Sequence, residues 1–209
     1  MEDLGEYTII LSQKDLSEMK EILEISLNII FFHRNLSNNN CEDTTGKLIN
    51  ISYAKLKSQK LSKEISNILD TLEKNLNLEN NLYGCQITLN FYEKSEKNKN
   101  FENPWEKWIF ISNLVKGEVL KEKNDSNSNS SCLDKENIIR EYIFKIIDKL
   151  NDKENYMPKI TFDDKNSEEE TFSHNFKIDT IETEEEYLAL FNNYVKKNKE
   201  NVIIINQLP

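Results

Sequence analysis

Glycine is scarce in this chain, and its scarcity excludes a common kind of binding site. Four glycines occur among the 209 residues: Gly5, Gly46, Gly84 and Gly117. No two of them lie close enough to build the glycine-rich loop that surrounds a phosphate with backbone N–H groups. The sequence therefore predicts no nucleotide cofactor, and no other cofactor is indicated.

Cysteine and histidine are equally rare. The three cysteines are widely spaced and form no C-x-x-C pair: Cys41, Cys85 and Cys132. An odd number at such spacing indicates neither a disulfide framework nor a zinc site, and favours a reducing compartment. His33 and His174 lie far apart and at no ligand spacing from a cysteine, so we expect no metal. For His33, an interaction with the C-terminal dipole of a helix is favoured over catalysis.

Positive charge and long apolar runs are also lacking. Lys and Arg number 27 against 37 Asp and Glu, a formal net charge of -10. This balance argues against a protein that binds nucleic acid or anionic membranes through a positive electrostatic field over its whole surface. No apolar run approaches the ~20 residues of a membrane span. The acidic residues after Met1 do not match a signal peptide, so we expect a cytoplasmic protein.

Acidic clusters are present, at residues 168–170 and 184–186. Neither contains the alternating D-x-D-x-D-G loop that calcium coordination requires. Solvated runs are favoured, with the second cluster complementing a helix N-terminus. An enzyme with a cryptic acidic site stays an alternative, although no residue pattern demands catalysis.

The strongest structural signal lies in residues 86–115. Ile87, Leu89 and Phe91 alternate with polar residues, the period of two that is typical of a β-strand. A second β-branched and aromatic run at 109–111 follows Trp108, so the two segments predict an antiparallel hairpin at the centre of a sheet. Leu89, Phe91 and Phe110 are predicted core residues. At least one of Trp105 and Trp108 is expected to pack in the core, and this packing is favoured over stacking on a ligand.

The remaining elements follow from hydrophobic periodicity and capping residues. Strands are predicted at residues 6–11, 47–56, 172–181 and 202–205, the last of them buried. Helices are predicted from Ser12 or Asp15 to 33, from Ser58 over about twenty residues, at 134–150, and at 184–197 behind a capping box of Thr183 and Glu186. Residues 35–46 and 121–131 are predicted to be loops.

Five short motifs resemble one known family. They are Phe32-His33-Arg34, Ile51-Ser52-Tyr53, Leu89-Asn90-Phe91-Tyr92-Glu93-Lys94, Pro104-Trp105-Glu106-Lys107-Trp108 and Asn155-Tyr156-Met157-Pro158-Lys159. Their order and spacing resemble the HORMA domain, and at closer range the autophagy-related protein 101 family. We expect a single HORMA domain over residues 1–209. The resemblance covers residues 6–160, and residues 161–209 diverge from the family pattern.

The resemblance implies an α+β fold, with a mixed or antiparallel sheet and three long helices packed on it. It also implies a non-enzymatic adaptor of the autophagy-initiating kinase complex, which pairs with the HORMA domain of autophagy-related protein 13 and stabilises it. Recruitment to the phagophore assembly site is a further expectation. The alternative is a HORMA protein of the spindle checkpoint, meiosis or DNA repair, which holds a partner peptide with its C-terminal belt.

The same resemblance suggests where partners bind. Members of the family carry an exposed Trp and Phe, the WF finger, between the hairpin strands. Here that connection, residues 95–103, contains Phe101 and no tryptophan.

HORMA domains also commonly pair through the third helix and the adjacent sheet edge. Arg140 and Phe144 are therefore the candidate partner-binding residues, because Phe144 falls off the apolar stripe of helix 134–150. The stripe is formed by Ile138, Ile139, Tyr142, Ile143, Ile146, Ile147 and Leu150. Packing of Phe144 under a neighbouring loop is the alternative.

Overall fold

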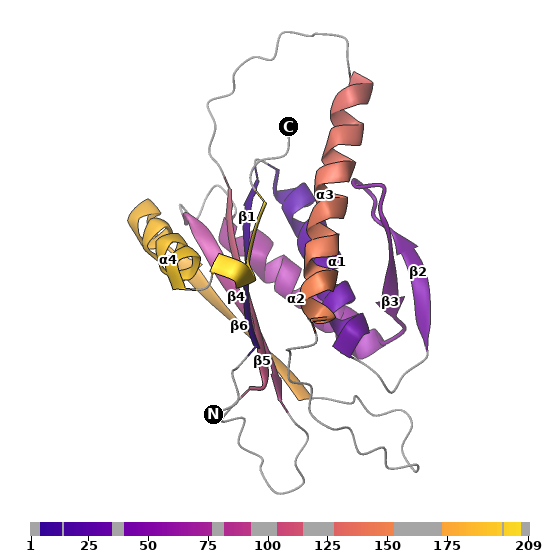
Figure 1. Ribbon diagram of the computed structural model, residues 1–209, viewed down its shortest axis with the longest axis horizontal. Helices are drawn as coiled ribbons and strands as arrows, with labels where there is room; N and C mark the ends of the chain where they lie inside the picture. Colours follow the sequence, from indigo (N-terminus) through magenta and orange to yellow (C-terminus); the bar gives the residue numbers. More distant parts are fainter. Residues whose placement is uncertain are drawn as a thin grey trace, which may run out of the picture.

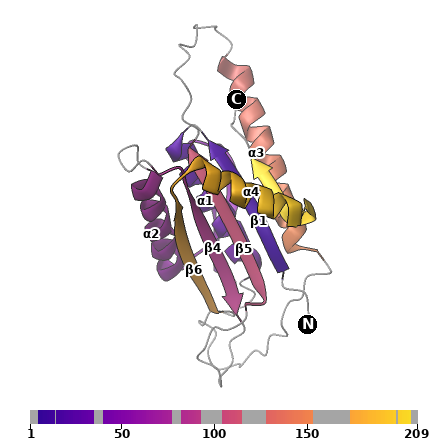
Figure 2. The same cartoon turned by 90° about the vertical axis from the view of Figure 1, so that its left-hand side faces the viewer.

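The computed structural model describes residues 5–13, 15–34, 40–76, 82–92, 104–114, 128–152, 173–197 and 199–205. A mixed five-stranded sheet in the order β6-β4-β5-β1-β7 forms its centre (Figures 1 and 2). The strands are β1 (Gly5–Gln13), β4 (Gly84–Tyr92), β5 (Glu106–Leu114), β6 (Ser173–Ile181) and β7 (Val202–Ile205). β1 runs parallel to both β5 and β7, whereas β4 is antiparallel to β5 and β6.

The predicted hairpin is confirmed. β4 and β5 pair with Leu89 opposite Trp108 and Ile87 opposite Phe110, and β5 is the middle strand of the sheet. Leu89, Phe91 and Phe110 are buried, as the alternation predicts, and so are both tryptophans. Large aromatic side chains from one hairpin thus supply much of the core.

Helices cover both faces of the sheet unequally. α1 (Leu16–Arg34), α2 (Gln59–Leu76) and α3 (Ser128–Leu150) lie on one face, and α4 (Glu184–Lys197) crosses the other (Figure 1). A 3₁₀ turn, Lys199–Asn201, leads from α4 to β7. The α+β class with a mixed sheet is confirmed and agrees with a HORMA-like fold, to which α4 adds a fourth helix.

The predicted helix caps are also present. Asp15 Oδ1 accepts the N–H of Ser17 at 2.6 Å. Ser58 caps α2 and Thr183 caps α4 through their hydroxyl oxygens, each accepting the N–H three residues later at 3.2 Å. These bonds satisfy donors that the first turn of a helix leaves without partners.

The strand predicted at residues 47–56 is wrong in its first half. Only β3 (Ser52–Leu56) is extended, and it pairs with β2 (Cys41–Thr45), which lies in a segment predicted to be a loop. β2 is a largely exposed polar strand without apolar alternation, so its sequence carries no strand signal. Pairing with β3 supplies the hydrogen bonds that make it a strand.

Three further predictions need correction. α3 begins at Ser128 and not at residue 134, because an existing helix extends by one hydrogen bond per residue without requiring an apolar face. Ile138 was assigned to the buried stripe of this helix but is 40% exposed. β7 was predicted to be buried, and it is an edge strand in which Ile203 and Ile205 are buried while Ile204 is partly exposed.

Candidate partner-binding surface

The inner face of α3 packs on α1. Four of its buried residues, Ile139, Tyr142, Ile146 and Leu150, are less than one-twentieth exposed. The hydroxyls of Tyr142 and Ser26 share a hydrogen bond of 2.9 Å, and burial raises the pKa of Tyr142 above its ordinary value. This face is therefore fixed, and the opposite side of α3 is what the helix presents outward.

The outer face of α3 carries the two residues that the sequence proposed. Phe144 is 62% exposed, and Arg140 is exposed one turn earlier on the same side. The position of Phe144 off the buried face is thus confirmed, and the alternative of cover by a described loop is not supported. Ile138 lies about 120° from Phe144 around the helix, so it does not extend the same patch.

The sheet edge beside α3 is β7. This helix contacts β7, and Ile203 and Ile205 belong to the same hydrophobic core as Tyr142 and Ile146. No strand among the described residues pairs with the outer side of β7. Together α3 and β7 form one side of the molecule, seen on the right of Figure 2. The other candidate residue, Phe101, lies outside the described residues.

A buried ion pair lies at the base of this side. Arg34 Nε is 2.9 Å from both carboxylate oxygens of Glu106, and Arg34 Nη2 donates to Oε2 at 2.6 Å. Trp108 Nε1 donates to Glu106 Oε1 at 2.6 Å. Arg34 Nη1 donates to the carbonyl of Leu150 at 3.1 Å, and the guanidinium lies 5.7 Å from the centre of the Trp105 ring.

Two of the motifs that carry the family resemblance therefore meet in space. The end of α1 supplies Arg34, β5 supplies Glu106 and Trp108, and Trp105 directly precedes β5. Reasoning from the sequence assigned no role to Arg34 or Glu106. Two features of the sequence could have indicated a role. Arg34 ends an apolar helix, and Glu106 lies between two tryptophans, and charged residues are rarely buried in such apolar surroundings unless they are paired.

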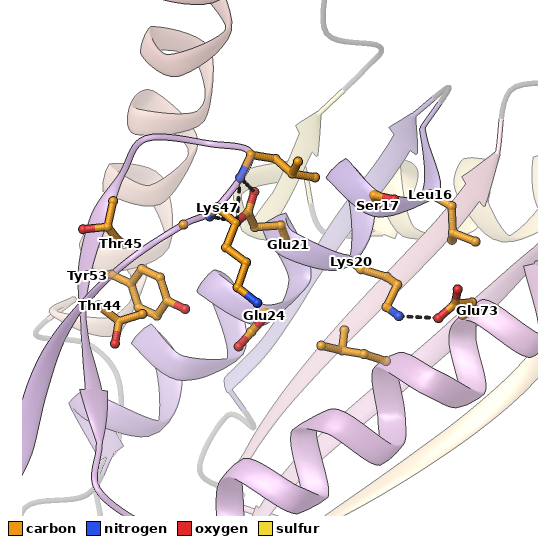
Figure 3. Close-up of a pocket in the computed structure, with 13 residues that line it drawn as sticks. Leu16, Ser17, Lys20, Glu21, Glu24, Thr44, Thr45, Lys47, Tyr53 and Glu73 are labelled. Atoms are coloured by element: carbon orange, nitrogen blue, oxygen red, sulfur yellow. Dashed lines mark hydrogen bonds and ion pairs between the residues drawn. The ribbon is translucent and has the colours of Figure 1, made fainter.

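A pocket of about 410 Å³ lies between α1, α2 and the β2–β3 hairpin (Figure 3). The carboxylate of Glu21 accepts the backbone N–H groups of Lys47, Leu48 and Ile49, and so holds the turn between the two strands. Lys20 pairs with Glu73 across the pocket. Lys20 and Glu73 thus satisfy each other, and Glu21 is satisfied by backbone N–H groups, so the pocket is primarily a junction of elements.

The two histidines of the chain do not lie together in one site. His33 Nδ1 is 2.9 Å from the carbonyl of Ile29 in the last turn of α1, in agreement with the expected role at a helix end. His174 Nε2 lies 3.1 Å from Glu64 and packs against Phe31. Within the described part of the chain, no group of three or more His, Cys, Asp or Glu could hold a metal ion.

The acidic clusters have different outcomes. Residues 184–186 form the first turn of α4, where negative charge complements the helix dipole as predicted. Residues 168–170 lie outside the described ranges.

The five-stranded mixed sheet and its helices define an α+β protein, and this arrangement is consistent with a HORMA-like fold. A sequence model of the family described as Autophagy-related protein 101 matches residues 13–164, most of the chain. The chain belongs to the autophagy-related protein 101 family, and its role is therefore in autophagy. No curated protein matches it. None of the helices that the structure describes is long and apolar enough to cross a membrane.

Proposed function

We propose that this chain is a non-enzymatic adaptor subunit of the autophagy-initiating kinase complex, built as one HORMA domain over its whole length. It pairs with the HORMA domain of autophagy-related protein 13 and stabilises that partner. Pairing takes place in the cytoplasm, and the resulting complex is recruited to the phagophore assembly site.

The exposure of Phe144 on α3 carries this proposal. An aromatic side chain that is 62% exposed on a helix whose other face is fully packed has apolar area left for a partner. Arg140, one turn away, supplies the second residue type that is enriched in binding hot spots. The edge of β7 lies beside this helix, as the pairing of HORMA domains requires by resemblance.

Titration against the HORMA domain of autophagy-related protein 13 tests the proposal. Phe144→Ala is expected to weaken pairing by about 2 kcal/mol, or about 30-fold in Kd, because it removes a central aromatic anchor. Arg140→Glu is expected to weaken pairing as well, with both variants still folded.

Leu188→Ala is the matched control. Leu188 is also an exposed apolar residue on a helix, but it lies on α4, across the sheet from α3. Its removal should leave the affinity unchanged. Wild-type affinity in both Phe144→Ala and Arg140→Glu would move the interface away from α3.

The alternative role in the spindle checkpoint, meiosis or DNA repair is disfavoured by the family match over residues 13–164. Co-purification from the native cell followed by mass spectrometry separates the two. Subunits of the autophagy kinase complex support the proposal, whereas spindle, meiotic or repair proteins contradict it.

Phe101 is proposed as the one residue that retains the recruiting function of the family's finger. Phe101→Ala should abolish capture of downstream autophagy factors without changing affinity for the partner HORMA domain. Unchanged capture would mean that this chain recruits those factors elsewhere.

A further inference from the structure

Arg34 connects three elements that are distant in sequence. It is the last residue of α1, and its partners are Glu106 at the start of β5 and the carbonyl of Leu150 at the end of α3. The guanidinium is 3% exposed and makes four hydrogen bonds of 2.6 to 3.1 Å. Few side chains can serve two elements in this way, because only Arg has a planar fork of five donors.

The hydrogen bond from Arg34 to the Leu150 carbonyl has a structural effect that is separate from that of the ion pair. The last four carbonyls of an α-helix have no partner within the helix, and a cation near them also interacts favourably with the helix dipole. Arg34 therefore caps the C-terminal end of α3 from another helix. Phe144 lies six residues before Leu150, about 9 Å along the helix axis.

The same guanidinium lies at the base of the β4–β5 connection. Its Cζ is 5.7 Å from the ring of Trp105, and Trp105 donates its backbone N–H to the carbonyl of Phe91 at 2.9 Å. This bond joins the two strand ends between which Phe101 occurs in sequence. One buried cation thus contacts the structural supports of both candidate partner-binding regions.

We propose that Arg34 is a positioning residue, which fixes the last turn of α3 against the start of β5 and so sets the orientation of the partner-binding face. The anchoring of α3 stands on the observed contacts alone. Its effect on pairing rests on the proposed function.

Arg34→Lys separates anchoring from simple stability. Lysine keeps the positive charge beside Glu106, but its single ammonium cannot form the fork to the carboxylate and reach the Leu150 carbonyl as well. The matched control for hydrogen exchange is Arg140→Lys, the same substitution at an exposed position of α3. Both variants keep the net charge of the chain.

Amide hydrogen exchange of the full chain measures the anchoring. In Arg34→Lys, exchange in the last turn of α3 should accelerate about tenfold, while β1 and α2 stay as protected as in the wild type. Arg140→Lys should change none of these rates. The indole N–H resonances of Trp105 and Trp108, the only two tryptophans of the chain, should shift in Arg34→Lys alone. Unchanged exchange at the end of α3, or an equal acceleration throughout the chain, overturns the proposal.

Titration of Arg34→Lys against the partner HORMA domain, with Leu188→Ala on α4 as the control for affinity, measures the consequence for pairing. Arg34→Lys should bind about tenfold more weakly than Leu188→Ala and the wild type, because the face that meets the partner is no longer held in one orientation. A loosened α3 with wild-type affinity overturns the positioning role. If the wild-type chain itself does not bind, the proposed function fails, and the exchange experiment still decides whether Arg34 anchors α3.

Discussion

The chain contains two arginines, and their surroundings are opposite. Arg34 is 3% exposed and satisfies its charge with Glu106, whereas Arg140 stands on the exposed side of α3. The first holds three elements together inside the protein, and the second belongs to the proposed interface. The same side chain therefore has a structural consequence in one place and a binding consequence in the other, and burial makes the difference.

The energetic reason is solvation. A buried charge that loses its partner stays out of water and keeps the full cost of desolvation, while an exposed charge is simply hydrated. Substitutions at the two sites should therefore change the free energy of unfolding by different amounts, even when the chemical change is the same.

Removal of the counter-charge of Arg34 should have the largest effect. Glu106→Gln keeps the shape of the side chain and an acceptor for Trp108, but leaves the guanidinium without an anion. The expected loss of stability is about 3–5 kcal/mol in urea unfolding. Replacement of both partners, Arg34→Met with Glu106→Leu, should recover part of it. An unchanged unfolding midpoint in Glu106→Gln would show that the pair is not needed in charged form.

A pair of phenylalanines extends the contrast to apolar side chains. Phe91 is 2% exposed in the core, and Phe144 is 62% exposed on α3. Phe91→Ala should cost about 3–5 kcal/mol, because it removes buried area and leaves a cavity. Phe144→Ala should change stability by less than about 0.5 kcal/mol. Thermal unfolding of both variants decides the matter, and a large loss in Phe144→Ala would return that residue to the core.

A smaller effect is expected from Tyr53 at the pocket. Burial, followed by the charges of Glu24 and Glu21, raises the pKa of Tyr53 to about 12. In the unfolded chain the pKa is about 10, so its stabilising effect is complete below about pH 10 and is lost as the pH rises toward 12. The loss is on the order of 1 kcal/mol, because the residue is partly exposed. The free energy of unfolding can be measured for the wild type and for Tyr53→Phe at both ends of this pH range. The difference between the two proteins should decrease as the pH rises. A constant difference would mean that Tyr53 titrates normally.

The smallest change in stability is expected at Arg140. Arg140→Ala should alter the free energy of unfolding by no more than about 0.5 kcal/mol, since the side chain is hydrated in both states. Urea unfolding in parallel with Glu106→Gln makes the comparison direct. A loss as large as that of Glu106→Gln would remove the distinction between the two arginines.

The sequence predicted most of the elements and their faces. The hairpin, the helices, three caps and β6 follow from period, β-branched content and capping residues, all of which act over a few neighbouring positions. It also placed Phe144 off the buried face of its helix. It failed at β2, which is polar, and at Ile138, where an apolar residue at helical spacing remains exposed.

What the sequence determined by itself is therefore local: which segments are helices or strands, and which side of each is apolar. Only the tertiary structure decided that Arg34 and Glu106 would meet across 72 residues, and that Arg34 would cap a helix 116 residues further on. Charge and spacing do not distinguish Arg34 from Arg140. The packing of α1 and α3 against the hairpin distinguishes them, because it removes water from Arg34 and leaves Arg140 in solvent.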